Sequence, residues 1–205
     1  MLTYLVLGMT FAFAAAVQPG PLQAYLVAQA LSHGWRRTLP AALSPLVSDG
    51  PIIALVLFVL SRLPAWLIPA LRGAGGVLLL VLAVAAARTW RRPDAGAVRE
   101  GSRPRSLWGA TLVNLLNPGP YLGWSLVMGP LLLKGWHEAP ARGIALLAGF
   151  YGMMVLSLAA TIVLFAAARG LGPRVNRTLI GASALALAAL GVYQLWTFAA
   201  AYRPA

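Results

Sequence analysis

Six long apolar stretches dominate this chain of 205 residues, and they lie at residues 4–31, 39–60, 65–87, 107–133, 141–168 and 178–200. At a rise of about 1.5 Å per residue, each stretch is long enough to cross the roughly 30 Å hydrocarbon core of a bilayer as a helix. Because 60% of the residues are hydrophobic and only 10% are charged, the chain has too little polar surface for a soluble globule. The sequence predicts an all-α, polytopic membrane protein with six transmembrane helices.

The positive charges follow the expected membrane topology. Although the formal net charge is +12, all 16 Lys and Arg residues lie between the apolar stretches or at their ends, which argues against a nucleic-acid-binding surface. Eleven of them follow the first, third and fifth stretches, and five lie on the opposite side: Arg62, Arg72, Lys134, Arg142 and Arg203. By the positive-inside rule the first side is cytoplasmic. We therefore expect a multi-pass protein of the inner or plasma membrane with both termini outside.

The chain contains an internal repeat. Gln18-Pro19-Gly20-Pro21 in the first stretch corresponds to Asn117-Pro118-Gly119-Pro120 in the fourth, and a weaker match relates Asp49-Gly50 to Tyr151-Gly152. We expect two three-helix repeats, residues 1–87 and 107–205, joined by a basic cytoplasmic linker at residues 88–106. We interpret the linker arginines as solvated charges that set the membrane topology, and the alternative is that they bind anionic membrane lipid. Since each repeat has an odd number of spans, the two repeats are inverted, which is a common plan of transporters.

Each Pro-Gly-Pro segment is expected to break its helix. A proline lacks a backbone donor, so a carbonyl one turn earlier loses its partner, and at membrane depth such backbone must be buried in protein or line a wet cavity. The second proline suits the first turn of the next half-helix, whose positive end attracts a carboxylate, while the freed carbonyls attract an ammonium. A simple kink in a packed helix is the alternative. We expect a binding site for a zwitterionic substrate at Gln18, Pro19, Gly20, Pro21, Gln23, Asn114, Asn117, Pro118, Gly119 and Pro120.

Asp49 is the only acidic residue well inside an apolar stretch. A carboxylate at the centre of a membrane helix costs about 2.5 to 3.5 kcal/mol on insertion scales, and such residues often mark ion or substrate pathways. We expect Asp49 to couple transport to protons by accepting and releasing one. Its alternative role is a structural hydrogen-bond partner for nearby broken backbone.

Metal and enzyme chemistry are not expected. The chain has no Cys, and His33 and His137 lie at expected helix ends without ligand spacing, so neither a metal site nor a cofactor is predicted. The spans carry no Ser/His/Asp set, paired carboxylates or Gly-rich phosphate loop, so an enzyme is not predicted either. A cation or metal-ion exporter or channel of a related inverted-repeat family remains the alternative function, although such proteins need several intramembrane acids.

The motifs resemble those of the lysine-exporter (LysE-type) family of amino-acid exporters, which includes the homoserine and threonine exporters. The resemblance covers nearly the whole chain and rests on Pro19-Gly20-Pro21, Ser48-Asp49-Gly50 and Leu115-Leu116-Asn117-Pro118. Many members continue the last motif with a lysine, where this chain has Gly119. The resemblance implies a secondary transporter that exports amino acids or similar small metabolites, by exchange with protons and without a bound cofactor. A homodimeric assembly is left open.

Overall fold

The computed structural model describes residues 1–58, 67–91 and 103–201, which are helical throughout and include no strand. The elements run in the order α1 (Leu2–Val17), α2 (Pro21–His33), α3 (Trp35–Thr38), η1 (Leu39–Leu43), α4 (Ser44–Phe58), α5 (Leu67–Arg91), α6 (Arg103–Leu115), α7 (Pro118–Gly123), η3 (Trp124–Met128), α8 (Gly129–Glu138), α9 (Pro140–Ala167), η4 (Ala168–Leu171) and α10 (Pro173–Ala201). The expected all-α class is confirmed. Most of the predicted linker lies outside the described residues.

The first Pro-Gly-Pro segment separates two helices. α1 ends at Val17, α2 begins at Pro21, and the two helix axes meet at 65°. Neither Pro19 nor Pro21 has a backbone N–H, so α1 cannot continue its hydrogen-bond ladder through the segment. Pro21 occupies the first turn of α2, where a missing donor costs nothing.

The fourth apolar stretch is divided more finely. α6 ends at Leu115, the short helix α7 starts at Pro118, and η3 then forms a π-helical segment before α8. By length and apolar composition, four of the described helical segments can cross a membrane, namely Trp35–Val56, Pro69–Arg88, Pro140–Ala167 and Arg174–Ala201. The bent α1–α2 pair makes five if it counts as one span. Six spans in two inverted repeats remain a prediction.

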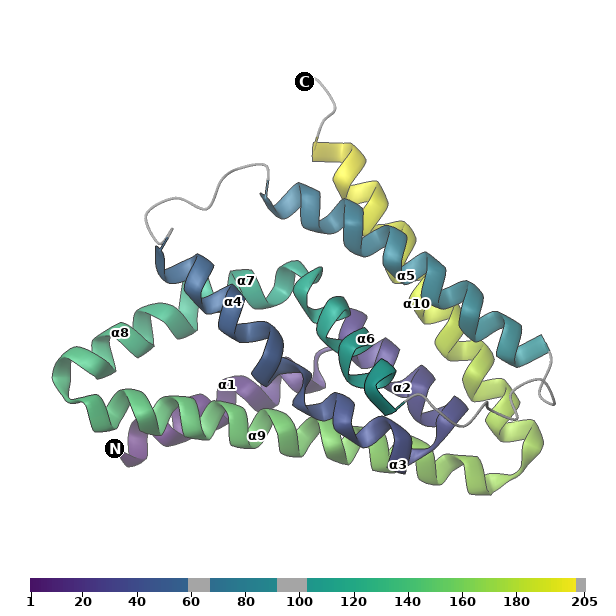
Figure 1. The fold of residues 1–205 in the computed structure, drawn as a ribbon, viewed down its shortest axis with the longest axis horizontal. Helices are drawn as coiled ribbons and strands as arrows, with labels where there is room; N and C mark the ends of the chain where they lie inside the picture. Colours follow the sequence, from purple (N-terminus) through teal and green to yellow (C-terminus); the bar gives the residue numbers. More distant parts are fainter. Residues whose placement is uncertain (59–66, 92–102, 202–205) are drawn as a thin grey trace.

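The two halves of the chain are interleaved (Figure 1). α1 packs along α9, α5 packs along α10, and α6 packs against η1 and α4, so each of these contacts joins an element of one half to an element of the other. The α1–α9 contact depends on Gly8 and Gly149. A Cβ added at either glycine would collide with backbone atoms of the opposite helix, so the two helices approach as closely as their backbones allow.

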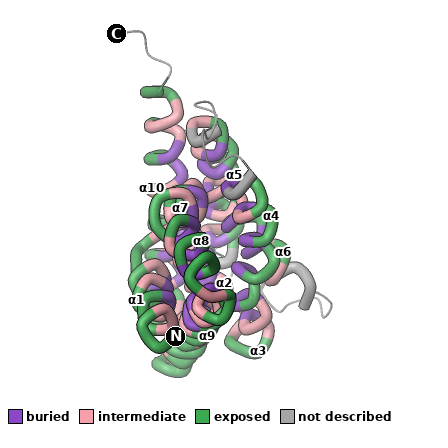
Figure 2. The backbone as a smooth tube through the Cα atoms, turned by 90° about the vertical axis from the view of Figure 1, so that its left-hand side faces the viewer, coloured by how far each residue is buried: buried purple, intermediate pink, exposed green. Residues whose placement is uncertain are grey.

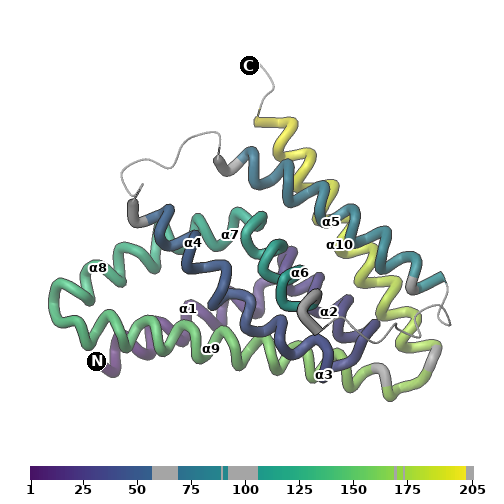
Figure 3. The backbone as a smooth tube through the Cα atoms, viewed as in Figure 1, coloured from purple at the N-terminus to yellow at the C-terminus, as the bar shows by residue number. Residues whose placement is uncertain are grey.

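The α5–α10 pair diverges from the rest of the bundle. Figures 1 and 3 show that this pair meets α9 near η4, which connects α9 to α10, and that the two bodies spread apart away from this join. The helix ends at the join carry many positive side chains, and Arg177 lies 5.6 Å from the ring centre of Trp90 there. We call this region the basic end, defined by Arg36, Arg37, Arg88, Arg91, Arg174 and Arg177.

Large apolar side chains cover the outside of the bundle. Leu126, Leu156, Leu164 and Leu185 are each at least 63% exposed, whereas Leu26, Leu146 and Leu158 inside are completely buried. Figure 2 shows the buried residues on the inner faces of the helices and the exposed residues on the outside. Such an extensive exposed apolar surface is typical of helices that face lipid.

Candidate functional site

A pocket of about 560 Å³ lies between the α5–α10 pair and the rest of the bundle. Both Pro-Gly-Pro segments line it, together with side chains from α1, α4, α5, α9 and α10. On α10 the lining residues are Leu190, Tyr193, Gln194 and Thr197, in the half of the helix farther from the basic end. The structure thus brings all of the sequence-predicted site residues to one pocket: Gln18, Pro19, Gly20, Pro21, Gln23, Asp49, Asn114, Asn117, Pro118, Gly119 and Pro120.

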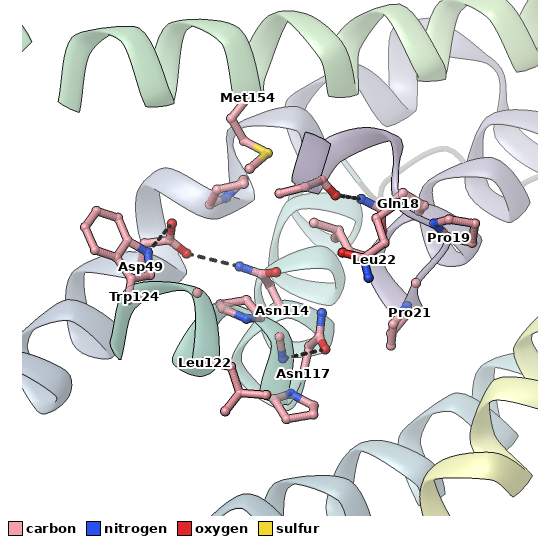
Figure 4. Close-up of a pocket in the computed structure, with 18 of the residues that line it drawn as sticks. Gln18, Pro19, Pro21, Leu22, Asp49, Asn114, Asn117, Leu122, Trp124 and Met154 are labelled. Carbon is pink, nitrogen blue, oxygen red and sulfur yellow. Dashed lines mark hydrogen bonds between the residues drawn. The ribbon is translucent and has the colours of Figure 1, made fainter. Parts of the chain in front are cut away.

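Asp49 lies in the wall of this pocket and is only 3% exposed. Its Oδ1 accepts a hydrogen bond of 3.2 Å from Nδ2 of Asn114, and its Oδ2 accepts one of 3.3 Å from Nε1 of Trp124 (Figure 4). The hydroxyl of Ser48 adds a contact of 3.5 Å to Oδ1, and it accepts a 2.7 Å bond from Asn114. Neutral donors therefore compensate this buried carboxylate, and two of them come from the second half of the chain.

Aromatic side chains surround the carboxylate. Tyr151 of α9 lies against Asp49, at the position that the weaker repeat match relates to Asp49. The ring of Phe150 packs edge-on against Trp124, with 5.4 Å between the ring centres, and lies 6.2 Å from the ring of Phe11. These contacts fix the indole that donates to Asp49, so its hydrogen bond depends on the α1–α9 packing.

At the first break, a side chain hydrogen-bonds the backbone carbonyls that the end of α1 leaves without helical partners. Nε2 of Gln23 donates to the carbonyl oxygens of Ala15 and Ala16, each at 3.2 Å. The sequence led us to expect these carbonyls to attract a substrate ammonium, but Gln23 occupies them. Gln18 is exposed at the pocket surface.

The second break is satisfied in a similar way. Oδ1 of Asn117 accepts from the backbone N–H of Gly119 at 3.1 Å, which caps the start of α7. The hydroxyl of Tyr121 donates to the carbonyl of Leu115, the last residue of α6, at 2.9 Å. At both breaks side chains thus hydrogen-bond backbone groups that the turn leaves without helical partners, and both breaks line the pocket.

Comparison with known proteins identifies the family. A family model described as LysE type translocator matches residues 13–197, which is most of the chain. The chain belongs to this family. No curated protein and no solved structure matches it. LysE type translocators are transporters and not enzymes, and together with the apolar helices the match shows a multi-pass membrane transporter.

Several polar residues of this translocator line the pocket without having been predicted to do so, and Arg72 and Gln194 are two of them. From the sequence, Arg72 of α5 is one of the five cations on the side opposite the cytoplasm, and Gln194 of α10 is not among the predicted site residues. Gln194 is 6% exposed, and within the described part of the chain its Oε1 has no hydrogen-bond partner. A polar residue inside the last apolar stretch was the signal that could have identified Gln194.

Trp124 was also missed as a partner of Asp49. Its place in the middle of the fourth stretch distinguishes it from the tryptophans at helix ends, but its direction depends on the π-helical turn that it begins. Within the described residues there is no group of three or more His, Cys, Asp or Glu side chains that could hold a metal ion.

Proposed function

We propose that this LysE type translocator exports amino acids or similar small metabolites across the cell membrane by alternating access, in exchange for protons that Asp49 carries. One observation supports the proposal above all others. A single pocket is lined by both Pro-Gly-Pro segments and by the buried acid, although these residues are far apart in the sequence.

The pocket suits a small solute that is partly polar. Its volume of about 560 Å³ lies within the roughly 300 to 1,000 Å³ range of small-molecule sites. Apolar groups such as Phe11, Phe150 and Met154 share its wall with the amides of Gln18 and Asn117. A few fixed polar groups in an apolar pocket give orientation and specificity, which an amino acid with its charged backbone groups would use.

The arrangement of the two bodies supports alternating access. The α5–α10 pair and the rest of the bundle meet at the basic end, which the positive-inside rule assigns to the cytoplasm, and the pocket lies on the side where they diverge. A rocking motion that opens the basic end and closes the other would expose the same pocket to the opposite side.

Asp49 is suited to proton coupling because it lines the pocket that the rocking motion would expose to each side of the membrane in turn. The carboxylate belongs to α4, whereas Asn114 belongs to α6 and Trp124 to η3. All three elements belong to the body that the α5–α10 pair rocks against, so the motion leaves these hydrogen bonds in place and changes the access of water to the pocket beside the carboxylate. Loss of water around a carboxylate favours its protonated form. A conformational change can thereby be linked to proton uptake and release.

The test uses the full-length protein reconstituted in vesicles that are loaded with a mixture of labelled amino acids. We expect efflux that increases when a proton gradient is imposed. The Asp49→Asn variant keeps the shape of the side chain but cannot exchange a proton, so it should retain amino-acid exchange without a gradient and lose the stimulation. Glu138→Gln is the matched control, because it removes an acid that is outside the pocket.

Two results would count against the proposal. If the wild-type protein moved no amino acid but released labelled divalent cations, the metal-ion alternative would replace amino-acid export. If Asp49→Asn responded to the gradient as the wild type does, Asp49 would have no role in coupling. A loss of stimulation in Glu138→Gln as large as that in Asp49→Asn would point to a general effect of charge.

A further inference from the structure

Arg72 is the one positively charged side chain among the described residues that line the pocket, and Asp49 is the one negatively charged side chain there. The two lie on different bodies, because Arg72 belongs to α5 of the α5–α10 pair and Asp49 belongs to α4. The pocket therefore has one charge of each sign, carried by walls that diverge from each other.

The charge of Arg72 is not used within the described structure. The acids of the described residues are Asp49 and Glu138. Asp49 is bonded to neutral donors, and Glu138 is bonded to Tyr4 and Arg142. No hydrogen bond or ion pair of Arg72 occurs within the described parts of the chain. An arginine near a membrane span is costly to place, and one that faces a cavity commonly serves a ligand.

The backbone around Arg72 is held in place by close packing. A Cβ at Gly73 would lie 3.2 Å from the ring of Phe198, and one at Gly76 would lie 2.8 Å from the Leu195 side chain. One at Gly75 would lie 2.6 Å from both the carbonyl oxygen of Leu116 and Oε1 of Gln194. α5 is thus pressed against α10 and the end of α6 just after Arg72, which fixes where the guanidinium stem begins.

Gln194 adds a second polar group to the same wall. Gln194 lines the pocket and is only 6% exposed. Its Oε1 has no hydrogen-bond partner within the described residues. A buried amide with an unused acceptor costs free energy unless a ligand or a conformational change satisfies it. The α5–α10 wall therefore carries polar groups, the Arg72 guanidinium and the Gln194 Oε1, that the described residues do not use.

We propose that Arg72 is the carboxylate anchor of the substrate site, so that the transported solutes are those with a free carboxylate. This inference rests on the proposed function, whose site it refines. The planar guanidinium presents paired N–H donors that match a carboxylate in two parallel hydrogen bonds. Amines and amides of the same size, which lack the anionic group, are poor substrates.

The experiment measures exchange by the reconstituted full-length protein with two probes: the best-exchanged labelled amino acid, and the amide of that amino acid. We expect the wild type to prefer the acid. Arg72→Gln should raise the KM for the acid about tenfold to a hundredfold, leave that for the amide within about twofold, and so abolish the preference. Arg72→Lys keeps the charge but loses the paired donors, so its KM for the acid should lie between those of the wild type and Arg72→Gln.

Lys134→Gln is the matched control, because Lys134 is an exposed cation on the same expected side of the membrane and does not line the pocket. It should preserve the preference. Retained exchange of the amide by Arg72→Gln shows that the variant is folded. A wild-type preference that survives in Arg72→Gln would overturn the inference, and so would an equal loss of both probes in Arg72→Gln and Arg72→Lys, which indicates a structural role. Absence of any amino-acid exchange by the wild type would instead refute the proposed function.

Discussion

The close approach of α1 and α9 predicts that Gly149→Ala destabilises the protein. A Cβ at Gly149 would collide with the carbonyl oxygen of Leu5, and the next nearest atoms, the carbonyl carbon and Cα of Leu5, would be at 3.0 and 3.2 Å. All of these are backbone atoms, so no rotamer change can relieve the collision. α1 must move away from α9, which weakens the packing on which membrane helices rely.

Two opposing contributions determine how far Gly149→Ala changes the free energy of unfolding. Alanine is about 1 kcal/mol more favourable than glycine inside a helix, and overpacking a tight contact costs about 1 to 3 kcal/mol. Gly152→Ala on the same helix separates the terms, because no heavy atom lies within 4 Å of a Cβ there. Gly152→Ala should therefore be neutral or slightly stabilising. We expect Gly149→Ala to be less stable than Gly152→Ala by the full packing term, about 1 to 3 kcal/mol.

The assay is reversible unfolding in mixed detergent micelles, followed by circular dichroism, on wild type and both variants. α1 also carries Phe11 and Ala15 of the pocket wall, so Gly149→Ala should reduce amino-acid exchange while Gly152→Ala leaves it unchanged. If Gly149→Ala proved as stable as Gly152→Ala, the α1–α9 contact would be looser than the structure describes and the argument from backbone collision would fail.

Two further predictions concern polar contacts, one at the second break and one around Glu138 at the end of α8. Tyr121→Phe removes the donor to the Leu115 carbonyl at the second break and should lower the free energy of unfolding by about 1 kcal/mol. The control Tyr193→Phe changes an exposed ring and should leave the free energy of unfolding unchanged. Equal effects of the two variants in the same unfolding assay would contradict this prediction. Between α8 and α9, Arg142 and Tyr4 donate to Glu138 and hold its pKa below the ordinary glutamate value of about 4.3. The ionised form is thus favoured in the folded state, so this contribution is present above pH 4.3 and is lost as the pH falls through the lowered pKa. The melting temperature of Glu138→Gln should be slightly below that of the wild type at pH 7 and equal to it in acid; a difference that persists in acid would refute the ion-pair explanation.

Sequence reasoning predicted the helices and the residues at their breaks for simple physical reasons. The apolar stretches at 65–87, 141–168 and 178–200 correspond to α5, α9 and α10, because length and apolar composition are local properties. Proline chemistry is equally local, and α1 and α6 indeed end shortly before the two Pro-Gly-Pro segments. The isolated acid Asp49 was recognisable from its apolar neighbours alone.

The partners of these residues were not predictable in the same way. The fourth stretch became α6, α7, a π-helical turn and α8, and that turn determines which side of the helix Trp124 occupies. Arg72 lies near the start of a span, where hydropathy alone gives it a topological role, and its place in the pocket wall depends on how α5 packs against α10 and the end of α6. Contacts between distant elements depend on helix rotation and crossing angle, which a single sequence does not report.

The side-chain hydrogen bonds at the breaks bear on which groups of the pocket can bind the charges of a substrate. The sequence suggested that freed carbonyls and half-helix ends would bind the two charges of a zwitterion, but Gln23 and Tyr121 satisfy those carbonyls, and α7 has only six residues. Among the described pocket residues, Arg72 of α5 is the one positively charged side chain, whereas the breaks belong to the rest of the bundle. If Arg72 anchors the carboxylate as proposed, a solute that contacts both Arg72 and the breaks binds more tightly when the two bodies approach. Such a solute shifts the population toward the closed arrangement, whereas one that lacks a carboxylate loses the contact with Arg72 and favours closure less.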